Sequence, residues 1–195
     1  MLKLYRRSSL AVLAVAVLIA CFASVGRAAD PGKIDPRGLI VLMRHAEAPG
    51  VGDPPNFQLG DCATQRNLDA TGREQARRVG DRLRSLAIGE ATVYSSQWCR
   101  CRETARLLEV GPVQDLPVLN SFFERREGRD AQIASLRSFL AGLPADGAPV
   151  VLVTHQVVVT ALTGVFPGSG ESVLLRANGT DKPAIEGRIK ADGAR

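Results

Sequence analysis

The chain reads LIVLMRH from Leu39 to His45. Five apolar residues in a row, with the turn formers Pro36 and Gly38 just before them, are typical of a buried strand. This strand runs directly into a cation and an imidazole, Arg44 and His45. Ligands of open α/β sheets bind at the carboxyl ends of the strands. The end of this strand is therefore the first place to expect a functional site.

Strands and helices are expected to alternate along the rest of the chain. Helical spacing of apolar residues predicts helices at 71–86, 98–108, 133–143 and directly after 154, the last weakened by β-branched residues. Apolar runs predict strands at 91–95, 113–119, 149–154, 172–177 and 184–189. Residues 46–66 hold three prolines and three glycines and are expected to form a long loop. The alternation predicts an α/β fold: a single-domain three-layer sandwich with a mainly parallel sheet.

The first residues differ in kind from the rest. A basic start, an apolar run of 14 residues at 10–23 and small residues before Ala28 follow the order of a secretory signal. We expect a signal peptide at 1–28, a linker at 29–37 and one domain at 38–190, with export to the periplasm. A retained membrane anchor is an alternative, although a spanning helix needs about 20 residues. A lipid anchor on Cys21 is another, and only these two alternatives would attach the protein to a membrane.

The net charge of the chain depends on this leader. The 195 residues carry 25 bases and 20 acids. Four of the bases and none of the acids lie in 1–28, which leaves 21 bases against 20 acids, a net charge of +1. This charge gives no case for binding nucleic acid.

Three cysteines lie in the expected domain: Cys62, Cys99 and Cys101. An exported protein meets oxidising conditions, which favour a disulfide. Cys99 and Cys101 are two apart in an expected helix and point to different faces, so we expect Cys62 to bond one of them. Three unbonded cysteines and a zinc or redox site are the alternatives, but the paired spacing of a zinc site is absent and we expect no metal.

Three expected strand ends hold residues suited to one chemistry. The chain has only two histidines, His45 and His155, and each follows an apolar strand or its last residue. Arg44 precedes the first histidine, and Arg100 follows another strand near the start of a helix. A neutral imidazole is a good nucleophile near neutral pH. Guanidinium groups match the charged oxygens of a phosphoryl group in transfer, and His155 would add a donor if protonated.

These blocks resemble the histidine phosphatase superfamily, also called phosphoglycerate-mutase-like. Its first strand ends in Arg-His-Gly, its second block is Ser-Ser-Pro followed by Arg and Thr-Ala, and a late strand ends in His. The matching residues here are Arg44-His45-Ala46, Ser95-Ser96-Gln97 with Arg100 and Thr104-Ala105, and Val150 to His155, with Leu68, Gly72 and Gln75-Ala76 between the first two blocks.

The resemblance implies roles for these residues. His45 would be the phosphorylated nucleophile, and Arg44, Arg100 and His155 would bind the phosphate. Arg102 competes for the role of Arg100 but would face elsewhere on the helix. Ala46 in place of glycine should matter only where the backbone needs a positive φ.

The general acid is the gap in the resemblance. Many members carry a glutamate in a Leu-x-Glu context, where this chain has Leu119-Asn120-Ser121. Glu124 and Glu127 follow closely and are the candidates, although both could be surface charges. Without a strong acid the enzyme would favour good leaving groups, of which phosphohistidine is one.

The resemblance therefore implies a phosphatase that needs no metal or organic cofactor. It would hydrolyse a small phosphorylated substrate, a phosphate monoester or a phosphohistidine. The leader expected at 1–28 would place this reaction outside the cytoplasm. The main alternative is a non-catalytic phosphate-binding protein of the same fold. Oligomeric state and the natural substrate do not follow from the sequence.

Overall fold

The computed structural model describes residues 34–191. The signal peptide expected at 1–28 and the lipid anchor on Cys21 lie outside the described residues. The helices are α1 (Ala70–Ser85), α2 (Cys99–Leu107), α3 (Arg129–Ala141) and α4 (Gln156–Thr163). The strands are β1 (Leu39–Arg44), β2 (Thr92–Ser95), β3 (Val113–Asp115), β4 (Val150–Thr154), β5 (Ser172–Arg176) and β6 (Ala184–Ile189).

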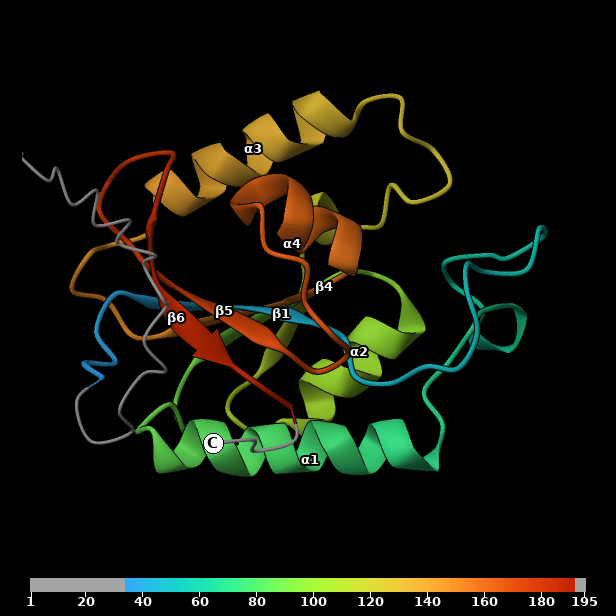
Figure 1. Cartoon of the computed structure of the whole chain (residues 1–195), viewed down its shortest axis with the longest axis horizontal. Coiled ribbons are helices and arrows are strands. Elements are labelled where there is room, and N and C mark those ends of the chain that lie inside the picture. Colours follow the sequence, from blue (N-terminus) through green and yellow to red (C-terminus); the bar gives the residue numbers. More distant parts are fainter. Residues whose placement is uncertain (1–33, 192–195) are drawn as a thin grey trace, which may run out of the picture.

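One six-stranded sheet organises the domain. Its strand order is β3-β2-β4-β1-β5-β6. The first four strands in this order pair in parallel. Strand β5 pairs antiparallel with β1, and β6 pairs antiparallel with β5. Helices α1 and α2 cover one face and α3 and α4 cover the other (Figure 1). The predicted three-layer α/β fold with a mainly parallel sheet is confirmed.

The central strand β1 contributes to two cores. Leu39, Val41 and Met43 pack into the cluster beneath α1 and α2, whereas Ile40 and Leu42 pack into the cluster beneath α3 and α4. Successive side chains of a strand point to opposite faces of a sheet. This explains why the strand is apolar throughout rather than alternating.

The structure also differs locally from the sequence prediction. The poor strand expected at 113–119 ends at Asp115, and a short 3-10 turn at Pro117–Leu119 follows it. The helix α4 forms despite its β-branched residues, because Val158, Val159 and Leu162 are buried on one side. Packing of an apolar face thus outweighs weak helix propensity.

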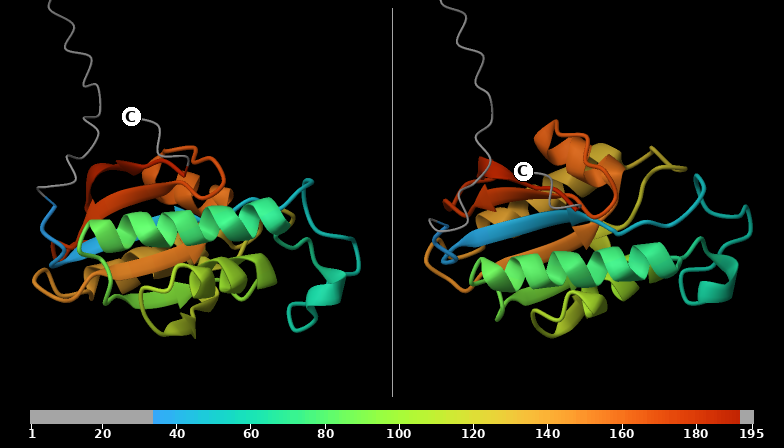
Figure 2. Two further views of the ribbon diagram at one scale, coloured as in Figure 1. Left: turned by 90° about the horizontal axis from the view of Figure 1, so that it is seen from below. Right: turned by 60° about the horizontal axis from the view of Figure 1, so that its bottom comes forward.

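The loop at 46–66 extends past the carboxyl end of β1 and is coloured cyan to teal in Figure 2. It contains one 3-10 turn, at Cys62–Thr64. Within residues 34–191, no helix has the length and apolarity needed to cross a membrane.

Candidate active site

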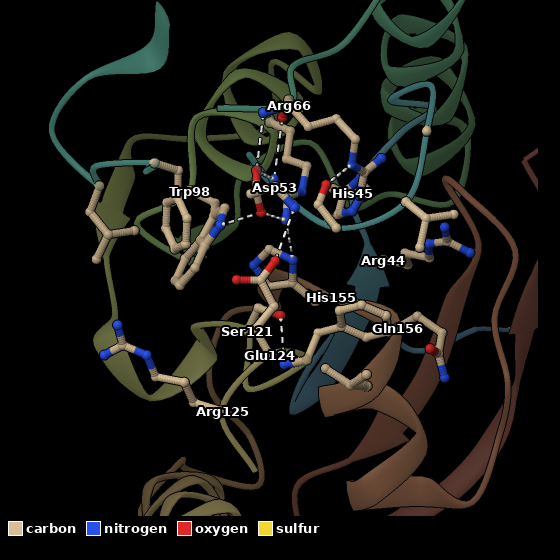
Figure 3. A pocket seen from close by; sticks show the side chains of 18 of the residues that line it. Arg44, His45, Asp53, Arg66, Trp98, Ser121, Glu124, Arg125, His155 and Gln156 are labelled. Carbon is tan, nitrogen blue, oxygen red and sulfur yellow. Dashed lines mark hydrogen bonds and ion pairs between the residues drawn. The ribbon is translucent and has the colours of Figure 1, made fainter. Parts of the chain in front are cut away.

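The three predicted strand ends meet at one edge of the sheet. Strands β2, β4 and β1 are neighbours, so their carboxyl ends lie side by side. A cavity of about 520 Å³ opens there, and its lining includes Arg44, His45, Arg100 and His155. Figure 3 labels Arg44, His45 and His155 in this cavity. All four residues that the sequence singled out for phosphate chemistry therefore lie in one cavity.

His45 is held as a neutral imidazole with a defined tautomer. Its Nδ1 lies 2.7 Å from the carbonyl oxygen of Ala46. A carbonyl can only accept, so Nδ1 carries the hydrogen and Nε2 carries the lone pair. Burial, followed by the positive charge of Arg100, holds the pKa of His45 well below its usual value. The side chain is therefore an available nucleophile at neutral pH.

Two motif residues fix the backbone just beyond His45. The Ala46 N–H donates to the hydroxyl of Thr104 at 3.1 Å, and the Glu47 N–H donates to the side-chain oxygen of Gln75 at 2.8 Å. At Gly72 a Cβ atom would lie 1.9 Å from the Glu47 carbonyl oxygen, so only glycine permits this approach of α1. Ala46 is not among the residues with positive φ, which explains why it can replace glycine.

Two arginines contribute donors that lack a partner. The Nε atoms of Arg44 and Arg100 are buried and make no hydrogen bond within the described residues. Arg44 donates from Nη1 to the Pro167 carbonyl at 3.2 Å. Buried donors are almost always paired in native proteins. Two unpaired guanidinium donors in the same cavity as His45 indicate a site that binds an oxyanion.

Asp53, in the long loop, pairs with Arg100. Its carboxylate accepts from Arg100 Nη1 at 2.7 Å and from Nη2 at 2.9 Å. It also accepts from Trp98 Nε1 and from the Arg66 backbone N–H, both at 3.0 Å. Burial opposes its ionisation, but the Arg100 hydrogen bonds and those of Arg66 and Trp98 outweigh it and lower its pKa. Figure 3 shows Asp53 between Trp98 and Arg66.

Arg66 is a third cation in the cavity that the sequence reasoning missed. Its Nε donates to the Gly52 carbonyl at 2.8 Å, and Nη1 donates to the Ala48 carbonyl. Burial and then the charge of Arg100 lower its pKa, which reflects crowded cations. Asp53 and Arg66 both lie in an irregular loop, and only their charge and the turn formers around Asp53 signalled them.

His155 is neutral and is oriented by a hydrogen-bond chain. Ser96 donates its hydroxyl hydrogen to Asn120 Oδ1 at 3.2 Å. Ser96 Oγ therefore accepts from His155 Nε2 at 2.9 Å, and Nδ1 accepts from Arg100 Nη2 at 3.5 Å. Burial, then the neighbouring His45 and Arg100, hold the pKa of His155 well below its usual value. His155 can donate to a phosphate only after it takes up a proton.

The three cysteines of the domain and Arg102 lie as follows. Cys62 bonds Cys99, which ties the long loop to the start of α2. Cys101 is a free buried thiol whose pKa burial raises to about 12, so it is inert as a nucleophile. Arg102 points away from the cavity and donates from Nε to Asp115 at 2.8 Å, as its position on the helix predicts.

The two acid candidates separate in the structure. Glu124 lines the cavity, and its Oε1 accepts the Asp53 N–H at 3.1 Å. Glu127 is exposed and does not line the cavity. Ser121 also lines the cavity.

The cavity is suited to a doubly charged anion. Four arginines and two carboxylates line it: Arg44, Arg66, Arg100, Arg125, Asp53 and Glu124. With both histidines neutral, these groups leave a net charge of +2. A phosphate monoester dianion would balance this charge.

The comparison with protein families gives a match that agrees with this geometry. Residues 40–134 match the family model described as "Histidine phosphatase superfamily (branch 1)". The chain belongs to the histidine phosphatase superfamily. The matched residues include Arg44, His45 and Arg100. His155 lies beyond them, at the end of a strand adjacent to β1 in the sheet.

Solved structures extend the likeness over most of the domain. The protein histidine phosphatase SixA complexed with tungstate has a TM-score of 0.59 at 16% identity, over 78% of this chain and 97% of that chain. A phosphoserine phosphatase mutant from Entamoeba histolytica in complex with phosphoserine has a TM-score of 0.53 at 14% identity, over 79% and 98%. A mycobacterial glucosyl-3-phosphoglycerate phosphatase with VO3 has a TM-score of 0.54 at 17% identity, over 77% and 97%.

At these identities the structural likeness establishes the fold alone. A search of proteins with curated functions found no match to this sequence. The chain belongs to a phosphatase family and holds four residues suited to phosphate chemistry in one cavity: Arg44, His45, Arg100 and His155. Both findings support the assignment of the chain as a phosphatase.

Proposed function

We propose that this histidine phosphatase superfamily member hydrolyses a phosphate monoester, or a phosphohistidine, through a phosphohistidine intermediate on His45. One observation carries the proposal. A neutral imidazole with its lone pair on Nε2 lines the same cavity as two arginines, Arg44 and Arg100, whose buried Nε atoms are unpaired within the described residues. The arginines supply the positive charge that the reaction needs, so we propose that it requires no metal.

In the first step, Nε2 of His45 attacks phosphorus. The N–P bond to His45 forms as the bond from phosphorus to the leaving atom breaks, an oxygen in a monoester or a nitrogen in a phosphohistidine, and the leaving group takes a proton. Arg44 and Arg100 stabilise the charge that spreads over the equatorial oxygens. Nδ1 of His45 keeps its hydrogen bond to Ala46, which stabilises the positive imidazole of the intermediate.

In the second step, water attacks the phosphohistidine and releases inorganic phosphate and neutral His45. The attacking water must lose a proton. Of the two candidate glutamates, only Glu124 lines the cavity, and we assign it both proton transfers. Glu124→Gln is expected to slow hydrolysis of alkyl phosphates more than that of p-nitrophenyl phosphate, whereas Glu127→Gln is the matched control and should change neither.

Hydrolysis of p-nitrophenyl phosphate with and without EDTA, beside a folded His45→Ala variant, tests the proposal. Turnover that survives EDTA and is lost in His45→Ala is expected. Phosphate binding without turnover by the wild-type protein, at acid and neutral pH, would instead favour a phosphate-binding protein. The exposed Glu124 and the serine at position 121 are the observations on which that second candidate rests.

We also propose that the protein acts outside the cytoplasm. The leader pattern at 1–28 supports this location, and the disulfide between Cys62 and Cys99 is of the kind that persists in oxidising compartments. Fractionation of expressing cells tests the location, since enzyme found only in the cytosol would contradict it.

A further inference from the structure

Exposed apolar side chains gather at the candidate active site. Four large apolar residues are exposed in the described part of the chain: Val51, Phe123, Phe166 and Ile185. Val51, Phe123 and Phe166, which are 89%, 45% and 69% exposed, all line the cavity that holds His45. They come from three separate segments, the long loop, the segment before α3 and the segment after α4. Apolar residues clustered from three segments around one cavity mark a binding surface.

Aromatic rings continue this surface toward the ion pair of Asp53 and Arg100. Phe57 and Trp98 line the same cavity, with ring centroids 5.5 Å apart, and the Trp98 ring N–H is occupied by Asp53. The cavity of about 520 Å³ lies within the range of roughly 300–1,000 Å³ typical of small-molecule pockets. It therefore holds more than a phosphate, and the rest of its lining includes four aromatic side chains: Phe57, Trp98, Phe123 and Phe166.

The proton-transfer groups favour a particular leaving group. Carboxyl groups that act as acids near neutral pH are usually buried in apolar pockets. Glu124, the acid candidate that lines the cavity, is exposed. A phenol ionises near pH 10, far more readily than an aliphatic alcohol, so a phenolate leaves with little help from an acid.

We propose that the substrate class is an aryl phosphate, whose aromatic leaving group lies against Phe123, Phe166 and Val51 while His45 takes the phosphoryl group. This inference rests on the proposed function. Two independent observations converge on it, the exposed apolar side chains around the cavity and the exposure of Glu124. Free aryl phosphates and phosphotyrosine side chains share this chemistry.

The test compares phenyl phosphate with 2-naphthyl phosphate in the purified full chain. The two phenols have similar acidity, so the second ring mainly adds apolar surface. Wild-type protein should prefer 2-naphthyl phosphate on the order of tenfold in kcat/KM, mainly through KM. The double variant Phe123→Ala, Phe166→Ala should lose most of this preference. Ile185→Ala removes an equally exposed side chain outside the cavity and should keep it.

Each outcome separates the inference from the proposed function. Activity that depends on His45 but shows no preference for the second ring would overturn the aryl proposal alone, as would a preference that the double variant retains. Turnover that persists in His45→Ala would overturn the proposed function. A phosphotyrosyl peptide identifies the source, because faster turnover than that of 2-naphthyl phosphate indicates a protein side chain and slower turnover a small molecule.

Discussion

The pair between Asp53 and Arg100 is expected to be a large single contribution to the stability of the site. The two side chains are 5% and 3% exposed and make two direct hydrogen bonds. Asp53→Asn keeps the shape of the side chain but leaves a buried guanidinium without its counter-charge. Removing one partner of a buried ion pair destabilises a protein by about 3–5 kcal/mol.

Thermal unfolding measures this effect. For a protein of this size, 1 kcal/mol shifts Tm by about 2–4 °C, so Asp53→Asn should lower Tm by roughly 6–20 °C. An oxyanion should restore part of the loss, because it supplies negative charge to the freed Arg100. Sulfate should therefore raise Tm more in the variant than in the wild type.

A matched control comes from the surface pair of Arg102 and Asp115, which are 27% and 40% exposed. Exposed pairs contribute about 0.2–1 kcal/mol, so Asp115→Asn should hardly change Tm. The reasoning is refuted if the two variants lose similar stability, or if sulfate stabilises Asp53→Asn no more than the wild type.

Four further predictions follow from the site. Both histidines have lowered pKa values in the folded protein, so the unfolded chain binds more protons below about pH 6.5. As pH falls below this value, the free energy of unfolding should decrease by up to about 2.7 kcal/mol per pH unit. Denaturant titrations should show that His45→Gln reduces this slope by about half. Because His155 must gain a proton to donate, sulfate affinity measured by calorimetry should rise as pH falls from 8 to 6, with proton uptake; pH-independent binding would contradict this. Reduction of the bond between Cys62 and Cys99, 37 residues apart, should lower the free energy of unfolding by about 2–4 kcal/mol in urea titrations, and an unchanged midpoint would count against it. Thr104→Ala leaves the backbone N–H after His45 without its acceptor and should lose about 1–3 kcal/mol and much of the activity, whereas Thr104→Ser should retain both.

The fold was largely predictable because strands and helices alternate with clear apolar periods. β1 and β4 are continuous apolar runs, and α1 and α2 have apolar stripes. The helix α4 was predicted with less support, since its stability comes from burial of Val158, Val159 and Leu162 rather than from propensity. The helix α3 ends at Ala141 with Gly142 as its C-cap, two residues before the end predicted at Leu143.

The site was predictable where it lies at strand ends. Arg44, His45 and His155 lie at strand ends and Arg100 lies in the helix after β2. Their meeting could be predicted because parallel strands bring their carboxyl ends together. Asp53 and Arg66 come from a long loop whose path is set by tertiary contacts, so their pairing could not be predicted from local sequence.

The disulfide partner was left open in the sequence. The structure resolves it through the helix face that each cysteine occupies. Cys101 lies on the buried stripe with Thr104, Ala105 and Leu108, at spacings of three and four residues, and only Cys99 is left to meet Cys62. That stripe is visible in the sequence and could have decided the pairing.

The central claim is that His45 carries the phosphoryl group. Rapid quenching during turnover of p-nitrophenyl phosphate, followed by mass spectrometry of peptides kept at alkaline pH, tests it most directly. The account predicts an acid-labile phosphoryl group on His45, formed at least as fast as product and absent from His45→Ala. A phosphoryl group on another residue, or rapid turnover with no phosphorylated protein, would contradict it.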